Sequence, residues 1–536
     1  MEQVLSEVVI FNYITKGISK TLDGSFKINF EQFGILPGLI ESDALQAVQS
    51  LPGIHSLDES VTNINIRGGS NDQNLITWDG IKMYQAGHFF NLISAFNPNM
   101  TKSVTLIKNG TSSSLSDGVS GTIALKSSDK INANFKTSFS VNLININGLL
   151  NIPLGKKASI QISGRRSFSD LIDTHTSNHY FEKAFQNTEV LQNENNVISA
   201  DDNFIFYDIG AVLNYKISNK DKLKISFLNT QNSLSFLESA FINNEEESKV
   251  STSKQKNSAL GLFYSRKWSK VFKTTLQVYG IKYSLMANNV DLLNNKQLLQ
   301  ENSIEEIEIK LNSYYRINET SNLNGGYSFN ESGIYNLEEF SNPLFRVFSK
   351  DVLRKHALFS EFEFYSLNSK TYLKSGIRLN YIQPFNQFII EPRLNFKYKL
   401  LDVLTWDVLG EFKHQTATQF INFQNDFLGI ENRRWIASNN KDIPVIKSKQ
   451  LSTGLTYKDK GWLINAEIYF KNVRGITTQS QEFRNQFEFS KTDGNYFGNG
   501  VDFFINKKIH NLSIWASYSY QNINYKFSDL QSKKFT

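Results

Sequence analysis

A glycine-rich stretch, Asn63–Gly80, is the first place where residue types and spacing could do chemistry. Its sequence is "NINIRGGSNDQNLITWDG", and glycines let backbone N–H groups approach a phosphate. The stretch has neither the Gly-x-x-x-x-Gly-Lys-Ser/Thr nor the Gly-x-Gly-x-x-Gly spacing, and it leads into a strand pattern where a phosphate loop needs a helix. We interpret it as a hairpin-like connection in which Gly68 and Gly69 supply unusual dihedral angles and Asp79-Gly80 forms a second turn.

Other residue types that could do chemistry give no specific site. His175 and His179 have a spacing that could hold a metal on a helix, but no further ligand is evident, so we expect a solvated loop. The pair Glu305-Glu306 is more simply a solvated strand edge, and no Gly-x-Ser-x-Gly nucleophile motif occurs. We therefore predict no enzyme, no cofactor and no metal site.

Composition narrows the class of protein. The chain has 536 residues, no Cys, 42 Phe and 22 Tyr. Thiol catalysis and disulfides are excluded, and aromatic strand formers are plentiful. The net charge of +6 is modest and forms no run, so we predict no nucleic-acid partner. No segment reaches the roughly 18 apolar residues of a membrane helix, and the N-terminus is no secretory signal, so any signal would lie upstream.

From about residue 130 onward, long segments alternate with a period of two, as β-strands do. One such segment places apolar residues on one face and polar residues on the other: Trp462, Ile464, Ala466, Ile468 and Phe470 against Asn465, Glu467 and Lys471. A membrane β-barrel has this pattern, because its lipid-facing and lumen-facing side chains alternate.

The connections between these strands alternate in length. Short polar turns at 218–221, 269–271, 366–370 and 458–461 alternate along the chain with long Asn-rich connections at about 168–203, 238–255, 333–352 and 418–444. Short turns at one end and long loops at the other are typical of an outer-membrane barrel, and Trp268, Tyr457 and Trp462 fit an aromatic girdle near the short turns. The alternative is a large soluble all-β protein, whose strands are usually shorter.

The first 130 residues predict a small α+β unit. Ser42 is the expected N-cap of a helix with Ala44, Leu45 and Val48 on its buried face, and Pro52-Gly53 ends it. We expect short strands at about 61–67, 74–78, 103–107 and 121–125, and a second helical piece near 88–96.

These segments carry a family resemblance. "ILPGLIESDALQAVQSLPGI", "NINIRGGSNDQNLITWDGIKMYQAGHFFNLISAFNPNMTKSVTLIKNG" and "GTIALKS" together resemble the plug domain of TonB-dependent outer-membrane receptors, in the form common in Bacteroidetes-type bacteria. The resemblance implies a mainly β fold, an antiparallel transmembrane β-barrel of the 22-stranded type occluded by an N-terminal α+β plug. We expect an N-terminal segment at 1–24, the plug at 25–130 and the barrel at 131–536.

The resemblance also implies a function in the bacterial outer membrane. Such a receptor binds a scarce nutrient, such as a siderophore, a vitamin or a glycan, and TonB supplies energy for import; a surface lipoprotein is a further partner that the resemblance allows. "VLSEVVI" resembles the segment that contacts TonB, and its candidate contact residues are Leu5, Ser6, Glu7, Val8, Val9 and Ile10. Tyr84, Gln85 and His88 are candidates for a plug apex that faces the ligand, or for packing against the barrel wall.

The sequence departs from the family in two places. "TSSSLSDGVSG" stands where the family has an "ARYG"-like run, which leaves the plug contacts there open. We count about seventeen strands after residue 131, and an odd number cannot close a bacterial barrel, so we expect about five further strands in a longer protein. The alternatives to an uptake receptor are a non-transporting binding or signalling barrel and a truncated fragment.

Arg67 is the residue of the opening stretch most worth testing. A buried charge without a partner is costly. We therefore predict that Arg67 pairs with a Glu or Asp of the barrel wall and, with the turns at Gly68-Gly69 and Asp79-Gly80, latches the plug in place.

Overall fold

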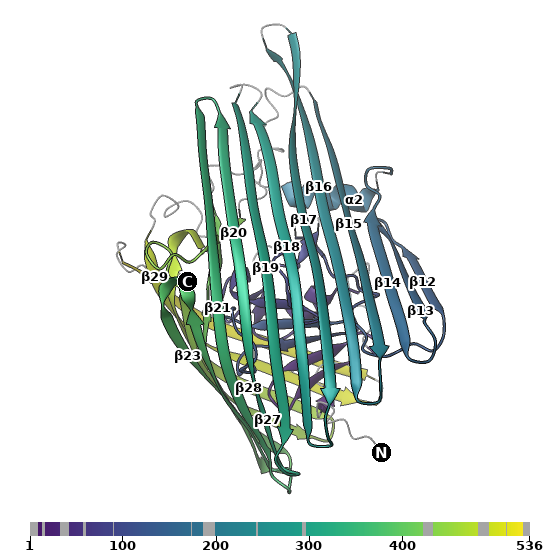
Figure 1. Ribbon diagram of the computed structural model, residues 1–536, viewed down its shortest axis with the longest axis vertical. Coiled ribbons are helices and arrows are strands. Elements are labelled where there is room, and N and C mark those ends of the chain that lie inside the picture. The colour runs from purple at the N-terminus through teal and green to yellow at the C-terminus, as the bar shows by residue number, and fades with distance from the viewer. Residues whose placement is uncertain are drawn as a thin grey trace.

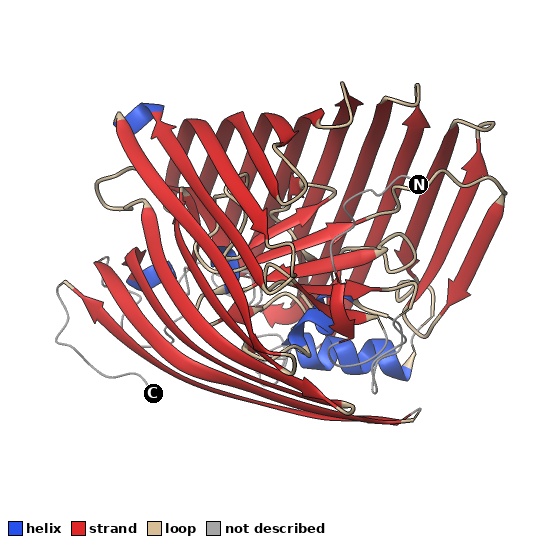
Figure 2. Ribbon diagram, turned by 90° about the horizontal axis from the view of Figure 1, so that it is seen from below, coloured by secondary structure: helices blue, strands red, loops and turns tan. Residues whose placement is uncertain are grey.

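The computed structural model describes residues 9–12, 17–32, 42–56, 60–88, 91–172, 174–185, 199–242, 245–291, 296–421, 433–480, 492–510 and 512–528. Two large sheets dominate these residues, one of 7 strands and one of 17 strands. The larger sheet curves into a wall, and the smaller one lies on the concave side of that wall (Figures 1 and 2). A mainly β fold with an antiparallel barrel wall and a small N-terminal plug is thereby confirmed.

The wall is a meander in which each strand pairs antiparallel with the next one in the sheet. Its strands are β12 (Lys136–Val141), β13 (Asn145–Pro153), β14 (Ala158–Ser167), β15 (Ser199–Lys216), β16 (Asp221–Ile242), β17 (Glu245–Lys267), β18 (Phe272–Asp291), β19 (Lys296–Arg316), β20 (Ser321–Ser341), β21 (Leu344–Tyr365), β22 (Thr371–Ile382), β23 (Gln387–Leu401), β24 (Leu404–Gln415), β27 (Ile446–Asp459), β28 (Trp462–Thr477), β29 (Asp493–Ile509) and β30 (Leu512–Phe527). Among the described strands β12 and β30 do not pair with each other, and closure of a 22-stranded barrel stays a prediction.

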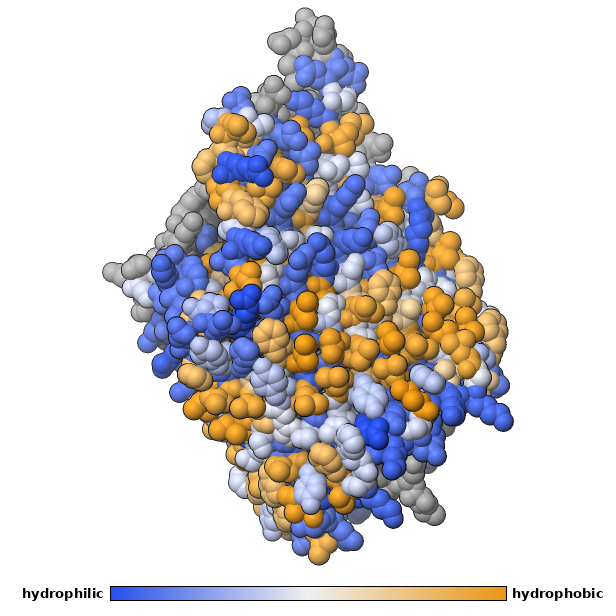
Figure 3. Space-filling view, viewed as in Figure 1, coloured by the Kyte–Doolittle hydropathy of each residue, from blue (hydrophilic) through white to orange (hydrophobic). Residues whose placement is uncertain are grey.

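The alternating sequence pattern places apolar side chains outside the wall. On β28, Ile468 and Phe470 are 47% and 48% exposed, whereas Glu467 and Lys471 of the same strand are buried against the plug. Figure 3 shows apolar side chains gathered across the middle of the outer face, with polar ones predominating on the tall strand ends. This arrangement suits a wall with lipid outside and a polar lumen inside. None of the described helices is long and apolar enough to cross a membrane.

Two connections expected to be long loops are instead strand. β16 and β17 continue to within a few residues of each other at Ile242 and Glu245, and β20 and β21 do so at Ser341 and Leu344. β17 has 23 residues, about 75 Å of strand, whereas the apolar band of such a barrel is about 25 Å tall. These hairpins therefore rise far beyond the band (Figure 1). The polar residues of these segments predict loops, but a strand that projects beyond the apolar band needs no apolar face.

The other two long connections contain structure of their own. The connection after β14 holds the helix α2 (His175–Phe185), and the one after β24 holds a hairpin of β25 (Ala417–Ile421) and β26 (Arg433–Ala437). The loop expected around His175 and His179 is thus a helix. His179 is solvent-exposed and lies near Glu182, and no group of three or more His, Cys, Asp or Glu that could hold a metal occurs in the described part of the chain.

Within its described residues, the plug comprises two short helical segments and eleven short strands. They are β1 (Val9–Asn12), β2 (Ile18–Thr21), β3 (Phe26–Asn29), α1 (Ala44–Gln49), β4 (Ile54–His55), β5 (Asn65–Ile66), η1 (Asn71–Gln73), β6 (Leu75–Trp78), β7 (Ile81–Lys82), β8 (Gly87–His88), β9 (Ile93–Ser94), β10 (Ser103–Ile107) and β11 (Thr122–Lys126). The main plug sheet has the order β1-β2-β3-β10-β11-β6-β7. β1 and β2, from the segment expected to precede the plug, belong to this sheet.

Two local predictions for the plug are wrong. The N-cap of α1 is Asp43 instead of Ser42, because the Asp43 carboxylate accepts hydrogen bonds from the N–H groups of Leu45 and Gln46. The helical piece expected near 88–96 is the small hairpin β8–β9, in which His88 pairs with Ile93. Phe89 and Phe90, which suggested a helix, lie outside the described residues. The buried face of α1, with Ala44, Leu45 and Val48, is as expected.

Candidate functional site: the interface of plug and wall

Arg67 lies at the centre of a buried charge cluster between plug and wall. Its Nη2 is 2.5 Å from Glu467 Oε1 on β28 and 3.2 Å from Asp502 Oδ2 on β29. Lys108 of the plug adds a second cation, with its Nζ 2.8 Å from Asp502 Oδ2 and 3.6 Å from Glu467 Oε2. Two cations thus meet two carboxylates, all buried. The ion pair expected for Arg67 is present, and its action as a latch stays a prediction.

The cluster is electrostatically balanced, which keeps Arg67 charged. Burial by itself lowers the pKa of the Arg67 guanidinium, but the carboxylates of Glu467 and Asp502 outweigh burial and raise it. The guanidinium also stacks 4.6 Å from the centre of the Tyr469 ring.

The backbone around Arg67 explains the glycines of this stretch in part. Arg67 and Gly68 have positive φ values of 50° and 76°, so the left-handed residues are these two instead of Gly68 and Gly69. A Cβ at Gly69 would lie 2.3 Å from Ser120 Oγ and 2.8 Å from Lys471 Nζ, so Gly69 permits close approach of the chain to the wall. The stretch is no hairpin, since β5 pairs with β4 whereas β6 pairs with β7 and β11.

The Asp79-Gly80 turn is present and also contacts the wall. Both residues have positive φ, 49° and 83°, and Trp78 pairs with Ile81 across the turn, as a tight hairpin requires. The Asp79 carboxylate accepts hydrogen bonds from Lys224 Nζ at 2.9 Å and Ser226 Oγ at 2.8 Å, both on β16. The second turn of the stretch is therefore anchored to the wall, as Arg67 is.

Tyr84 and His88 contact the wall, whereas the hydrogen bond of Gln85 stays within the plug. A ligand-facing role for these three residues stays a prediction. The Tyr84 hydroxyl donates to Glu306 Oε2 at 2.6 Å, and Gln85 Nε2 donates to the Gly87 carbonyl. His88 is fully buried, with Nδ1 2.6 Å from Asn232 Oδ1 and its ring stacked on Phe206. Burial lowers the pKa of His88. His88 is thus enclosed between plug and wall.

Glu306 was expected at a solvated edge and is instead buried. It lies inside β19, where it accepts hydrogen bonds from Tyr84 and from Tyr279, each at 2.6 Å. Its neighbour Glu305 points outward and contacts Lys282 on the exposed surface. Alternation along a strand sends the two adjacent carboxylates to opposite faces, and only the position of the plug decides which one is buried.

The serine-rich run that departs from the family pattern is held by wall carboxylates. Thr111 N–H donates to Glu411 and Ser113 N–H to Glu361, each at 2.8 Å, and Ser116 Oγ donates to Glu391 at 3.0 Å. Glu391 and Glu411 also contact Arg393 of the wall. The wall itself therefore supplies a cation here, and the plug supplies neutral donors.

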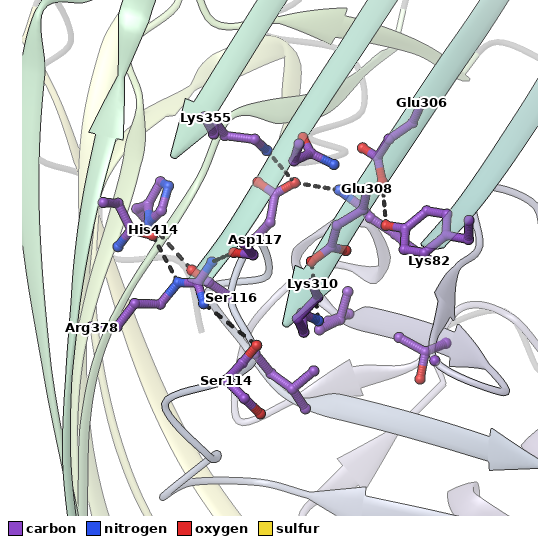
Figure 4. Close-up of a pocket in the computed structure, with 18 residues that line it drawn as sticks. Lys82, Ser114, Ser116, Asp117, Glu306, Glu308, Lys310, Lys355, Arg378 and His414 are labelled. Atoms are coloured by element: carbon purple, nitrogen blue, oxygen red, sulfur yellow. Dashed lines mark hydrogen bonds and ion pairs between the residues drawn. The ribbon is translucent and has the colours of Figure 1, made fainter. Parts of the chain in front are cut away.

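Asp117, at the end of this run, joins plug and wall beside a small polar cavity. Its Oδ2 is 2.5 Å from Lys82 Nζ of the plug and 2.9 Å from Lys355 Nζ of β21. Figure 4 shows these three side chains pointing toward one another, with Glu306, Arg378 and His414 around the same cavity. The cavity measures about 50 Å³, enough for one or a few water molecules. The interface is thus polar on both sides.

A hairpin that no sequence pattern predicts covers the plug. β25 and β26 fold over the apex around η1: Thr418 Oγ1 donates to Asp72 Oδ2 at 2.7 Å, and the Gln419 N–H donates to the same oxygen at 3.0 Å. Trp435 of β26 lies edge-on to Tyr84, and its backbone N–H donates to Asn302 of β19. Burial raises the pKa of Asp72. No periodicity could reveal these contacts between distant segments.

The candidate TonB-contact residues are described only in part. Leu5, Ser6, Glu7 and Val8 lie outside the described residues. Val9 and Ile10 belong to β1, the edge strand of the main plug sheet, and among the described strands β1 pairs only with β2.

Comparison with known proteins identifies the domain and the fold. The family model described as TonB-dependent Receptor Plug Domain matches residues 41–122. No curated protein sequence matches the chain.

Several solved structures are similar over most of the chain. A mutant of the ferric enterobactin receptor from Pseudomonas aeruginosa is 12% identical with a TM-score of 0.61, covering 94% of this chain and 85% of that one. The siderophore receptor PirA from the same species is 13% identical with a TM-score of 0.60, covering 95% and 88%. The copper transporter OprC is 12% identical with a TM-score of 0.65, covering 96% and 80%. At such identities the likeness concerns the fold, and together with the matched plug domain it confirms the resemblance to TonB-dependent receptors. The form common in Bacteroidetes-type bacteria stays a prediction.

Proposed function

We propose that this chain, a TonB-dependent receptor by its plug domain and its fold, imports a scarce nutrient across the bacterial outer membrane with energy transmitted by TonB. The observation that carries the proposal is the interface of plug and wall. The plug fills the lumen, yet charged and hydrogen-bonding groups hold it at Arg67, Asp79, Thr111 and Asp117. We propose no enzymatic activity.

A polar interface suits a plug that must move. Water can replace a hydrogen bond at modest net cost, about 0.5–1.5 kcal/mol each, so a force applied to the plug can open such contacts one after another. A plug with only a permanent structural role could be held more firmly by apolar packing, since buried ion pairs add little net stability.

The N-terminal strand offers TonB a point of attachment. β1 has one unpaired edge within the plug sheet, and an exposed edge can accept a strand from another protein. We propose that TonB binds the segment Leu5–Ile10, detaches β1 from β2 and draws on the plug. The nutrient would then pass along the polar interface, and the remaining partners would be the bilayer and a surface lipoprotein.

The test removes the proposed attachment point. Growth of the bacterium with and without the gene on single iron, cobalamin or glycan sources identifies a nutrient, and uptake of that nutrient is then measured for a variant lacking residues 4–10. We expect lost uptake and unchanged binding of the nutrient to cells. A variant with Glu2→Ala and Gln3→Ala, outside the segment, is the matched control.

Normal uptake by the deletion variant would refute transport through this segment. If the gene is needed for a response to the nutrient but never for its uptake, the chain is a binding or signalling barrel instead.

A further inference from the structure

A pocket of about 640 Å³ lies at the end of the wall that carries the long connections. Its lining comes from the upper ends of β20 and β21, from the outer face of the β25–β26 hairpin, from the connection after β26 and from the facing ends of β28 and β29. Its volume is within the range of pockets that hold small ligands, about 300–1,000 Å³.

The charges around this pocket do not favour an anion. Arg434 is paired with Glu338, and the remaining charged residues of the lining are Lys441, Asp442 and Asp493. Acidic side chains thus outnumber basic ones. The lining contains no Met or His, the thioether and imidazole ligands that suit copper and related metals.

Two hydroxyl groups in the pocket lining have no hydrogen-bond partner among the described residues. They are Thr477 Oγ1 and Thr492 Oγ1, on residues only 5% and 6% exposed. Phe420, Ile436 and Ile443 supply a half-buried apolar surface in the same pocket. Buried polar groups normally find partners, so these hydroxyls mark a place for a ligand that can donate or accept.

A small cavity on the inner side of the same hairpin has the same character. It measures about 50 Å³ between β26 and the plug apex. Four buried polar atoms that line it have no hydrogen-bond partner within the described part of the chain: Thr62 Oγ1, Asn71 Oδ1, Gln85 Oε1 and Trp435 Nε1. An acceptor-only anion cannot satisfy the two amide oxygens, and a cation cannot satisfy the indole N–H. Several hydroxyl groups together, each of which donates once and accepts, can satisfy all four.

We propose that the outer pocket binds a neutral, polyhydroxylated ligand, and that the β25–β26 hairpin separates this pocket from the cavity on the plug apex. The inference rests on the proposed uptake function and names its ligand class. Alternate residues of β26 face the two sides, with Arg434 and Ile436 toward the outer pocket and Arg433 and Trp435 toward the apex. The ligand must therefore displace the hairpin to reach the plug.

The test is binding to the purified full chain in detergent, with no TonB present. The probes are neutral oligosaccharides prepared from α-glucan, β-glucan, xylan and mannan, and a ferric catecholate siderophore as the anionic comparison. We expect binding of at least one neutral oligosaccharide and none of the ferric siderophore. Thr477→Val with Thr492→Val should weaken that binding about tenfold or more, because each lost hydrogen bond is worth up to roughly tenfold. Thr405→Val, at the opposite end of the wall, is the matched control.

Binding of the ferric siderophore alone, or of no probe, would overturn the ligand class, as would unchanged affinity in the double variant. None of these results depends on TonB. Loss of uptake on deletion of residues 4–10 would still support transport if the ligand class failed, so the two proposals can fail separately.

Discussion

Replacement of Arg67 by alanine should loosen the plug locally. Breaking a buried ion pair by removing one partner costs about 3–5 kcal/mol, because the other charge is left buried and unpaired. Lys108 remains 2.8 Å from Asp502 and 3.6 Å from Glu467, so one carboxylate keeps a partner. We therefore expect the low end of the range, about 3 kcal/mol, or roughly a hundredfold increase in the open fraction.

Amide hydrogen exchange of the wild-type and variant receptors measures this opening directly. Protection should fall about a hundredfold for peptides that cover residues 65–78, while the wall strands exchange as before. Arg166→Ala is the matched control. It removes an arginine whose side chain is 48% exposed and which pairs with Asp170 at 2.7 Å, and an exposed pair is worth about 1 kcal/mol or less.

A double variant separates charge balance from the loss of packing. Arg67→Ala with Glu467→Gln leaves Lys108 and Asp502 as one balanced pair. The plug of this double variant should be more stable than that of Arg67→Ala alone by at least about 1 kcal/mol, because substitutions within one ion-pair network are not additive. If the two substitutions simply add, the charge cluster does not hold the plug and the reasoning is refuted.

Three further predictions follow from plug contacts. Gly80→Ala should destabilise the plug by about 1–2 kcal/mol, since φ is +83° and the new Cβ would lie 2.4 Å from Gln277 Nε2. Hydrogen exchange measures this loss of stability. Gly148→Ala, whose new Cβ would meet no atom within 4 Å, is the control and should change the protection little. Burial raises the pKa of Asp117, but the nearby charges of Lys355 and Lys82 lower it by more, so the pKa lies well below its usual value. The stabilisation that the charged Asp117 carboxylate contributes is complete above about pH 4 and is lost as the pH falls through the lowered pKa. The protection of plug amides from hydrogen exchange should therefore fall less between pH 7 and pH 3 in Asp117→Asn than in the wild type. A Cβ at Gly376 would lie 3.1 Å from Ser113 Cβ, slightly closer than the roughly 3.5–4.5 Å of a disulfide. Because the chain has no Cys, the double variant Ser113→Cys with Gly376→Cys can form only this disulfide within the chain, and it should lose uptake when oxidised and regain uptake with reductant. Either single variant should transport under both conditions.

The sequence by itself predicts the strands of the wall and the face on which each side chain lies. Residues such as Glu467, Ile468 and Phe470 alternate in character because successive side chains of a strand point to opposite faces, one outward and one toward the plug, as in a membrane barrel. That constraint acts on every residue of a spanning strand, so about seventeen strands could be counted, and 17 are present. The plug strands and the buried face of α1 also follow local patterns, and the need of a buried Arg67 for a carboxylate follows from electrostatics alone.

Only the tertiary structure decided which groups meet across the interface. Glu467 and Asp502 lie some 400 positions from Arg67, and no local pattern distinguishes them from other inward carboxylates such as Glu411. The same holds for the burial of His88 and Glu306 and for the hairpin β25–β26 above Asp72. Strand periodicity fixes the face on which a side chain lies, whereas its partner depends on how the plug is seated in the wall, which is a property of the whole chain.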